Sequence, residues 1–487
     1  MESTETAPTR KVESFSRKEI VMSHASRRTF LKTGLSAAVG VGLSERSRAE
    51  GETARKQTPP NIVVLYTDDQ RLDALACMGN PIIQTPHLDS LAQQGVAFSN
   101  SFCTTSICCT SRATLVTGMH CERHGIVGFN QPLAPEIWRQ SFPMLLREPG
   151  YRTGFVGKWG IGGPMPEEDY DFWAGYAGQG SYFEEVDGKR KHRTKINRDG
   201  ALKFLDSCNS RQSFCLQVSF KAPHCLDGDP RPFHPDPEFD DLYADVEIPV
   251  PKTATEDCFK RLPSFLQESE GRVRWQIRFS TPELFQKSVK DYYRLVTGVD
   301  RAVGEIVAKL DEMGVRDNTL LFFTSDNGFF LGEHGLAGKW FMYEESIRVP
   351  LLLFDPRLPE GGRGKRVSEM VLSTDVAPTL LDYAGIPVPS RMQGRSLRPL
   401  VEGKATDWRT EWFYSHPFEH KRIPKCEGVR TKRWKYIRYI DFDPPYEQLF
   451  DLEADPCEER DLARQPTYSE RLKEMRQRWE KTRKEVI

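Results

Sequence analysis

The sequence predicts an α/β protein with a large central, mostly parallel sheet covered by helices on both faces, plus a smaller C-terminal α+β subdomain with an antiparallel sheet. Short, nearly continuous apolar runs recur along the chain, as expected of strands that are buried on both faces. Helical patterns lie between these runs. Beyond about residue 400 the pattern changes to short strands in a meander. The apolar runs span 61–67, 153–156, 214–220, 319–324 and 350–354.

Two helices have boundaries that the sequence marks. Thr85 is an expected N-cap, Pro86 occupies the first helical position and Gly95 ends the segment. Residues 282–313 form a long amphipathic pattern that ends before Gly314. Residues 225–275 are rich in Pro and Asp and are expected to be an elaborate surface loop. In the C-terminal part the expected strands and final helix are 411–415, 428–431, 434–440, 447–452 and 466–486.

Residues 1–49 are predicted to be an N-terminal extension and a twin-arginine signal peptide. The pair Arg27-Arg28 precedes Phe-Leu-Lys and about eleven weakly apolar residues at 33–43. That stretch is too short for a transmembrane helix, which needs about 20 apolar residues. Residues 47–49 offer a small-x-small cleavage site, and Met22 is a candidate start. The alternative is a basic surface helix followed by a Gly/Ala-rich linker.

We therefore expect three parts: 1–49 as signal, 50–402 as the α/β domain and 403–487 as the C-terminal subdomain. The expected location is periplasmic or secreted, with the twin-arginine translocase as a partner and no stable membrane insertion after signal removal. The eleven cysteines are compatible with oxidised pairs outside the cytoplasm, but spacing does not assign their connectivity.

The charge balance argues against nucleic-acid binding. Lys+Arg is 68 and Asp+Glu is 69, giving a net charge of −1. Removal of residues 1–49, which hold nine basic and five acidic side chains, brings the net charge to about −5. An acidic protein that binds an anion has to concentrate its positive charge locally, so any affinity for polyanions is expected only in a pocket.

Two acidic pairs follow predicted strands. Asp68-Asp69 follows the run 61–67, and Asp326-Asn327 follows the run 319–324. Ligands of open α/β sheets bind at the carboxyl ends of strands, and oxygen side chains suit a hard divalent cation such as Ca²⁺ or Mg²⁺. The alternative is that each pair forms an ordinary Asx turn.

A third candidate segment, 106–118, contains the adjacent cysteines Cys108 and Cys109. Adjacent cysteines do not easily reach one tetrahedral zinc, and no Cys/His partner spacing follows. A thiol at a helix N-terminus with a depressed pKa would be nucleophilic. Packing of two small cysteines in the core is the remaining alternative.

With these motifs the chain resembles the type I, formylglycine-dependent sulfatases of the alkaline phosphatase superfamily, and is most similar to bacterial exported carbohydrate sulfatases. The signature Cys-x-Pro-Ser-Arg followed by Leu-x-Thr-Gly is matched by Cys108, Ser111, Arg112, Leu115, Thr117 and Gly118. The register selects Cys108 over Cys109 because the arginine lies four residues on. Further matching motifs occur at 68–69, 85–89, 124–125, 157–159, 222–224, 325–328, 338–339, 343–350 and 449–452.

The resemblance implies an alkaline phosphatase-like fold and a sulfuric ester hydrolase. It implies that a formylglycine-generating maturation enzyme oxidises Cys108, whose hydrated aldehyde attacks sulfur and forms a covalent sulfate ester. The implied metal ligands, for Ca²⁺ with Mg²⁺ as the alternative, are Asp68, Asp69, Asp326, Asn327 and the modified Cys108. Besides Cys108, the implied catalytic residues are Arg112, Lys158 and Lys339, which stabilise charge. His224 is the implied base or leaving-group acid.

Two positions depart from the family pattern. Thr110 stands where Pro or Ala is usual, which bears on the maturation enzyme and its efficiency. Gly160 replaces the histidine of the usual Lys-Trp-His. His124 is interpreted as orienting the nucleophile segment, and His416 is a further candidate for reaching the pocket from the C-terminal subdomain.

The expected substrate is a sulfated carbohydrate, of hexosamine 6-sulfate type. The aromatic, Gly-rich segment 173–183 is expected to stack on sugar rings and is similar to stretches in hexosamine-sulfate sulfatases. Two alternatives remain at this point: a phosphodiesterase or phosphonate monoester hydrolase of the same superfamily, and a catalytically silent binder of sulfated glycans.

Overall fold

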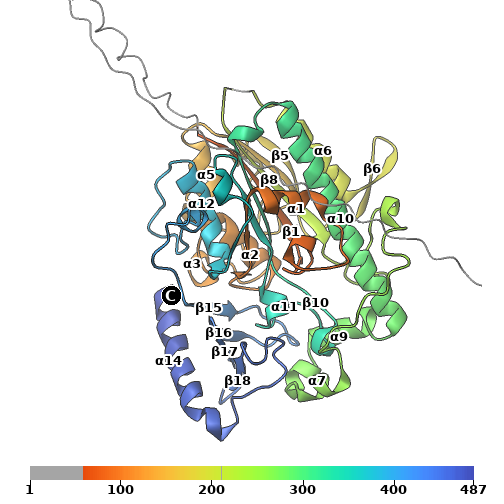
Figure 1. Ribbon diagram of the computed structural model, residues 1–487, viewed down its shortest axis with the longest axis vertical. Coiled ribbons are helices and arrows are strands. Elements are labelled where there is room, and N and C mark those ends of the chain that lie inside the picture. Colours follow the sequence, from red (N-terminus) through yellow and green to blue (C-terminus); the bar gives the residue numbers. More distant parts are fainter. Residues whose placement is uncertain (1–58, 210) are drawn as a thin grey trace, which may run out of the picture. The chain divides into compact units, whose positions relative to one another are not determined.

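The computed structural model describes residues 59–209 and 211–487, so the predicted export signal lies outside the described residues. In this part of the chain, one eight-stranded sheet has the order β13-β2-β12-β9-β1-β8-β4-β5. Its strands β1, β8 and β5 are labelled in Figure 1. Within this sheet, as far as the described residues go, only β12 runs antiparallel to its neighbours, which confirms the mostly parallel sheet. The strands are β1 (Asn61–Asp68), β2 (Val96–Phe98), β4 (Arg152–Lys158), β5 (Phe172–Tyr176), β8 (Phe214–Pro223), β9 (Thr319–Ser325), β12 (Leu351–Phe354) and β13 (Lys365–Val367).

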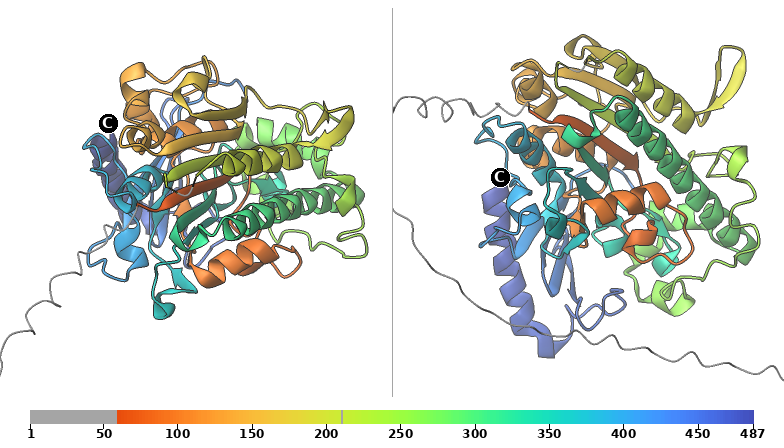
Figure 2. Two further views of the ribbon diagram at one scale, coloured as in Figure 1. Left: turned by 90° about the horizontal axis from the view of Figure 1, so that it is seen from above. Right: turned by 45° about the horizontal axis from the view of Figure 1, so that its top comes forward.

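The central strand β1 explains why the apolar runs are continuous. All eight of its residues are buried, and successive side chains point to opposite faces. Val63 and Leu65 pack under one helical layer, whereas Val64 and Tyr66 pack under the other. Figure 2 shows helices on both faces of the sheet. The first layer contains α1 (Pro86–Gln94), α6 (Arg193–Asp206) and α10 (Pro282–Glu312), and the second contains α2 (Cys108–Thr117), α5 (Phe142–Arg147) and α12 (Val376–Tyr383).

The two helices with marked boundaries form as predicted. In α10 the Thr281 side chain accepts a hydrogen bond from the Leu284 backbone amide, and Met313 follows as the C-cap. The helix α1 begins directly after Thr85. The Thr85 hydroxyl does not cap that helix, however, because it contacts the Asp89 carboxylate and the Ala76 backbone amide instead.

The C-terminal part is the predicted antiparallel meander. The strands β15 (Glu411–His416), β16 (Cys426–Thr431), β17 (Trp434–Tyr439) and β18 (Tyr446–Asp451) pair in chain order. Helix α14 (Ser469–Val486) covers one face, where Met475 packs near Tyr436. The other face packs against residues of the α/β part, including Tyr343. The boundary at 402/403 stays a prediction.

Residues 225–275 differ from the expected loop. They contain α7 (Glu256–Arg261), α8 (Ser264–Gln267) and the start of α9 (Glu270–Arg278). These helices are too short to show a helical period in the sequence. In addition, the buried residues of α9 are Glu270, Gly271 and Arg278 rather than an apolar stripe. Because its buried residues do not form an apolar stripe, α9 leaves no hydrophobic pattern to detect.

The remaining elements are short. They are β3 (Ser101–Phe102), α3 (Cys121–His124), α4 (Pro135–Trp138), β6 (Phe183–Val186), β7 (Lys189–His192), β10 (Phe330–Leu331), β11 (Ala337–Gly338), α11 (Glu344–Ile347), β14 (Val371–Leu372) and α13 (Arg398–Val401). Across residues 59–209 and 211–487, no helix has the length and apolar character needed to cross a bilayer. All eleven cysteines lie in these ranges as free thiols.

Gly157 in β4 is the glycine of this sheet at which a side chain would be most disruptive. A Cβ there would overlap the Ser219 carbonyl oxygen, and the φ angle of 102° lies in the left-handed region. Gly188 shares the left-handed conformation (φ 71°) but has open space around it. We expect Gly188→Ala to cost about 1–2 kcal/mol of unfolding free energy. Gly157→Ala should cost roughly 1–3 kcal/mol more. Urea denaturation measures both, and equal losses would contradict the overlap.

Candidate active site

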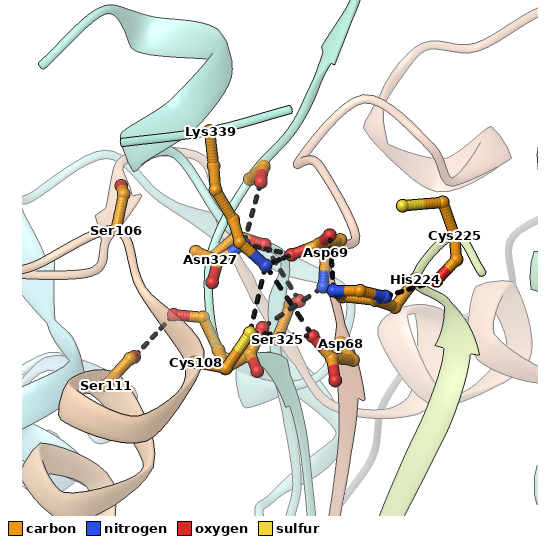
Figure 3. Close-up of polar contacts among 12 residues, drawn as sticks. Asp68, Asp69, Ser106, Cys108, Ser111, His224, Cys225, Ser325, Asn327 and Lys339 are labelled. Atoms are coloured by element: carbon orange, nitrogen blue, oxygen red, sulfur yellow. Dashed lines mark hydrogen bonds and ion pairs between the residues drawn. The ribbon is translucent and has the colours of Figure 1, made fainter. Parts of the chain in front are cut away.

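Four neighbouring strands bring the predicted polar residues to one edge of the sheet. In the order β9-β1-β8-β4, the carboxyl ends of parallel strands lie side by side. Each of these strands ends at, or is followed by, one or two chemically active side chains (Figure 3). From β9 to β4 these residues are Asp326, Asn327, Asp68, Asp69, His224 and Lys158. All six are buried.

Cys108 is the first residue of α2, a helix with no exposed residue. Its Sγ lies 3.2 Å from the Asp68 Oδ1 atom and 2.9 Å from the Lys339 Nζ atom. Cys109 points elsewhere and packs in the apolar layer under α2. The structure therefore brings only Cys108 of the pair to the strand ends, and the two thiols do not form half of a zinc site in the described residues.

The Cys108 thiol is not activated by its position at the helix N-terminus. Burial, with the negative charge of Asp68 second, raises the pKa of this thiol well above its usual range. Lys158 and Lys339 oppose that shift without reversing it. The depressed pKa expected of a nucleophilic thiol is therefore not found.

Three buried cations balance three buried carboxylates. The Lys158 ammonium contacts Asp68, and the Lys339 ammonium contacts Asp69. The Arg112 guanidinium lies 3.2 Å from Asp68 and 2.9 Å from Asp326. Because isolated charges are costly to bury, each of these groups depends on its partners. The site is one coupled network of opposite charges.

Gly160 leaves the space that Arg112 occupies. A Cβ at position 160 would lie 2.6 Å from Arg112 Cδ and 3.4 Å from Lys158 Cε. The residue also has a φ angle of 72°, which favours glycine. Beyond it, Arg112 donates to the Lys158 carbonyl at 2.9 Å and to the Ser219 hydroxyl. Glycine at position 160, where the family pattern has histidine, therefore leaves room for the Arg112 side chain.

The donor set fits a hard divalent cation. Asp68, Asp69 and Asp326 contribute carboxylates, and the Asn327 Oδ1 atom is buried without a hydrogen-bond partner among the described residues. Burial and the charge of Asp68 raise the pKa of Asp326 to about 7, so this crowded cluster gains from additional positive charge. Oxygen ligands of this kind suit Ca²⁺ or Mg²⁺. The Cys108 Sγ stands where an oxygen of formylglycine would lie.

The three candidate histidines have different environments. His224 places Nδ1 at 2.5 Å from the Cys225 carbonyl oxygen and Nε2 at 3.6 Å from Asp69, and burial lowers its pKa to about 4. His124 accepts from the Ile126 amide and contacts the Thr114 hydroxyl at 3.1 Å, so it fastens α2 to the following turn. His416 is fully buried and does not line the pocket; His420 does.

A pocket opens above Cys108 and contains residues that the sequence did not single out. They are Phe129, Gln179, Asp227, Glu270, Arg274, Arg278, Phe418 and His420. Of the segment 173–183, only Gln179 lines this pocket, and the Lys158 ammonium donates to it at 2.6 Å. The expected aromatic stacking by that segment is wrong. Trp173 stacks on Phe155 in the core, and Tyr182 is buried.

Residues 60–386 match the family model described as Sulfatase, which spans more than half of the chain. The chain belongs to the sulfatase family. Residues 332–485 match a second model, described as N-sulphoglucosamine sulphohydrolase, C-terminal. Membership identifies the protein as a sulfuric ester hydrolase.

Relatives and solved structures agree with this sulfatase assignment. The chain is 31% identical to the N-acetylglucosamine-6-O-sulfatase of Bacteroides thetaiotaomicron, over 88% of this chain and 86% of that protein. It is 28% identical to an arylsulfatase of Clostridium perfringens, over 86% and 93% of the two chains. A solved structure in complex with its substrate D-glucosamine-2-N,6-O-disulfate matches with a TM-score of 0.77 and 28% identity, over 88% of this chain and 98% of that one.

A phosphonate monoester hydrolase from Silicibacter pomeroyi has a TM-score of 0.74 at 22% identity, over 88% and 96% of the two chains. At that identity the likeness shows the alkaline phosphatase-like fold alone.

Arg112 provides a test of the charge network. Arg112→Ala leaves Asp68 and Asp326 without their shared partner and should lower the unfolding free energy by about 3–5 kcal/mol. Arg112→Lys keeps the charge but not the bidentate geometry, so its loss should be smaller. Thermal and urea unfolding measure both. An alanine variant as stable as the lysine variant would show that the arginine is not needed for charge balance.

Proposed function

We propose that this sulfatase hydrolyses the sulfate ester of a sulfated hexosamine, using formylglycine made from Cys108 and a divalent cation, Ca²⁺ with Mg²⁺ as the alternative. The observation that carries the proposal is the position of Cys108, between Asp68 and Lys339 at the base of the pocket. Formylglycine there supplies a hydrated aldehyde as nucleophile, and a cation held by Asp68, Asp69, Asp326 and Asn327 supplies polarisation of sulfate oxygens.

The buried cations position the nucleophile and stabilise charge. Lys339 contacts both the Cys108 Sγ and Asp69, so its ammonium lies within reach of the reacting atoms. Lys158 contacts both Asp68 and Gln179 and places a second positive charge behind Gln179, which lines the pocket. Preorganised charges in a water-poor site stabilise developing negative charge strongly. Arg112 holds Asp68 and Asp326 in place behind them.

His224 is suited to move a proton. Its Nδ1–H is donated to the Cys225 carbonyl oxygen, which leaves the Nε2 lone pair free toward the pocket and Asp69. A neutral imidazole with a fixed tautomer accepts a proton at Nε2 and returns it at the same atom. This supports its assignment as base or leaving-group acid.

The proposed substrate class rests on the relatives and on the pocket. One relative is named for N-acetylglucosamine 6-O-sulfate hydrolysis, and a solved relative holds a disulfated glucosamine. The pocket combines Phe129 and Phe418 with polar side chains, a mixture that suits a sugar ring. The silent-binder alternative has less support because the carboxylates, both lysines and Cys108 are all present and in contact.

Maturation and export are part of the proposal. Thr110 is buried inside α2, so the maturation enzyme would act on the chain before it folds. The twin-arginine pattern at 26–43 then supports transport of the folded protein to the periplasm or outside the cell.

Two adjacent cysteines allow a matched test of the nucleophile. Cys108→Ala should reduce kcat on 4-nitrophenyl sulfate by roughly 10⁴-fold or more, because the nucleophile is removed. Cys109→Ala should retain turnover and lose only stability, since that side chain packs in the core. Peptide mass spectrometry of protein from its native host should find an aldehyde at 108 and a thiol at 109. Loss of activity in the Cys109 variant alone would overturn the assignment.

A substrate panel separates the enzymatic alternatives. We expect kcat/KM on N-acetylglucosamine 6-sulfate to exceed that on a phosphonate monoester and on a phosphodiester by about 100-fold or more. Galactose and uronate sulfates and 4-nitrophenyl sulfate complete the panel. Turnover of aryl sulfate without any sulfated sugar would refute the hexosamine substrate, and faster phosphonate hydrolysis would refute the sulfatase preference.

A further inference from the structure

Gln179 stands between the buried Lys158 and the pocket above Cys108. The Lys158 side chain is 1% exposed, and Lys158 is not one of the described residues that line this pocket. Its ammonium contacts Asp68 and donates a hydrogen bond to the Gln179 Oε1 atom at 2.6 Å. Gln179, in contrast, lines the pocket together with Cys108 and Lys339. A sulfate group in the pocket would therefore meet the Gln179 side chain rather than the Lys158 ammonium.

The contact with Lys158 fixes which way the Gln179 amide points. An ammonium group has three N–H donors and no acceptor, so only the amide oxygen of Gln179 can face it. The Nε2 atom must then lie on the opposite side of the amide. Across residues 59–209 and 211–487, Nε2 has no acceptor and is not among the buried polar atoms that lack a partner, so it is accessible. The amide thus offers two N–H donors to a ligand.

The backbone on both sides of Gln179 is anchored to strand ends at the active site. Before it, the Tyr176 carbonyl accepts from the amide of Trp159, the residue that follows β4, at 3.0 Å. After it, the Tyr182 hydroxyl donates to the carbonyl of His224, the residue that follows β8. A side chain on a segment that is tied down at both ends is held in place for binding.

We propose that the Gln179 amide binds the sulfate group of the substrate, with an Nε2–H donated to a sulfate oxygen. Sulfate oxygens accept hydrogen bonds, and the amide is a neutral donor at the pocket surface. Because its Oε1 atom accepts from the Lys158 ammonium, the amide is polarised, and this strengthens the hydrogen bond that Nε2 donates. The buried lysine thereby acts on the substrate through the glutamine. This inference rests on the proposed function, in which the sulfate group lies above residue 108.

Gln179→Glu and Gln179→Ala test the amide in the matured enzyme. The glutamate keeps an oxygen that accepts from Lys158, but it lacks the N–H donor and adds a negative charge beside the sulfate. We expect kcat/KM on 4-nitrophenyl sulfate to fall by about 10–100-fold in the alanine variant. The loss in the glutamate variant should be greater, by roughly another tenfold. Inorganic sulfate, used as a competitive inhibitor, should bind both variants more weakly.

Gln276→Glu is the matched control for the added charge. Gln276 lies at an exposed position of α9, outside the pocket lining, so this variant should keep the kcat/KM of the unmodified enzyme. N-acetylglucosamine 6-sulfate serves as the second substrate. Since an aryl sulfate has no sugar hydroxyls, an amide that binds the sulfate group should give the same fold-loss on both esters. Thermal unfolding checks the fold, and the alanine variant decides if the glutamate variant does not fold.

The outcomes separate the role of Gln179 from the proposed function. Unchanged kcat/KM on both esters in the two Gln179 variants would overturn the inference and leave the sulfatase activity standing. A loss on the sugar sulfate alone would also overturn it, because the amide would then bind the sugar. If the unmodified enzyme hydrolyses 4-nitrophenyl sulfate but no hexosamine sulfate, the proposed substrate fails, and the aryl ester still decides the role of Gln179.

Discussion

The mutual neutralisation of buried charges at the carboxyl edge of the sheet is the constraint on which the rest of the structure depends. Asp68, Asp69 and Asp326 are almost completely excluded from water, and each contacts a buried lysine or arginine. Such groups are tolerated only when all partners are in place. Four strands must therefore end at the same edge, where Cys108 contacts Asp68 and Lys339.

The C-terminal sheet supports this centre although it contributes no residue to the charge network. The Tyr414 hydroxyl in β15 donates to the Trp340 carbonyl at 2.8 Å and accepts from the Ser106 amide at 3.3 Å. Trp340 follows Lys339, and Ser106 precedes Cys108 by two residues. The buried Tyr414 side chain thus joins the two segments that bring Lys339 and Cys108 into contact. The meander also packs on the α/β part through a hydrophobic cluster that includes Trp340 and Tyr414.

Reaction and recognition are built from different kinds of structure. The base of the pocket comes from strand ends and the buried helix α2, whose backbone positions are held by the sheet and the core. The outer lining comes from segments between these elements, including those with Phe129, Gln179, Asp227 and His420. Rigid elements give the reacting groups accurate geometry. Connecting segments generally tolerate more sequence change than the elements they join.

The sequence by itself determined the central strands, the long helix and the C-terminal meander, because burial and helix geometry leave local periodic signals. The Cys108–Arg112 pattern was recognised by its resemblance to the sulfatase signature. Only the tertiary structure decided which aromatic rings line the pocket, that Gly160 accommodates Arg112, and that Asp227 meets Arg274 in the lining of that pocket. These residues are separated by tens to hundreds of positions along the chain. A local pattern reports how a segment is buried, whereas a contact between distant segments depends on strand order and on short helices without an apolar stripe.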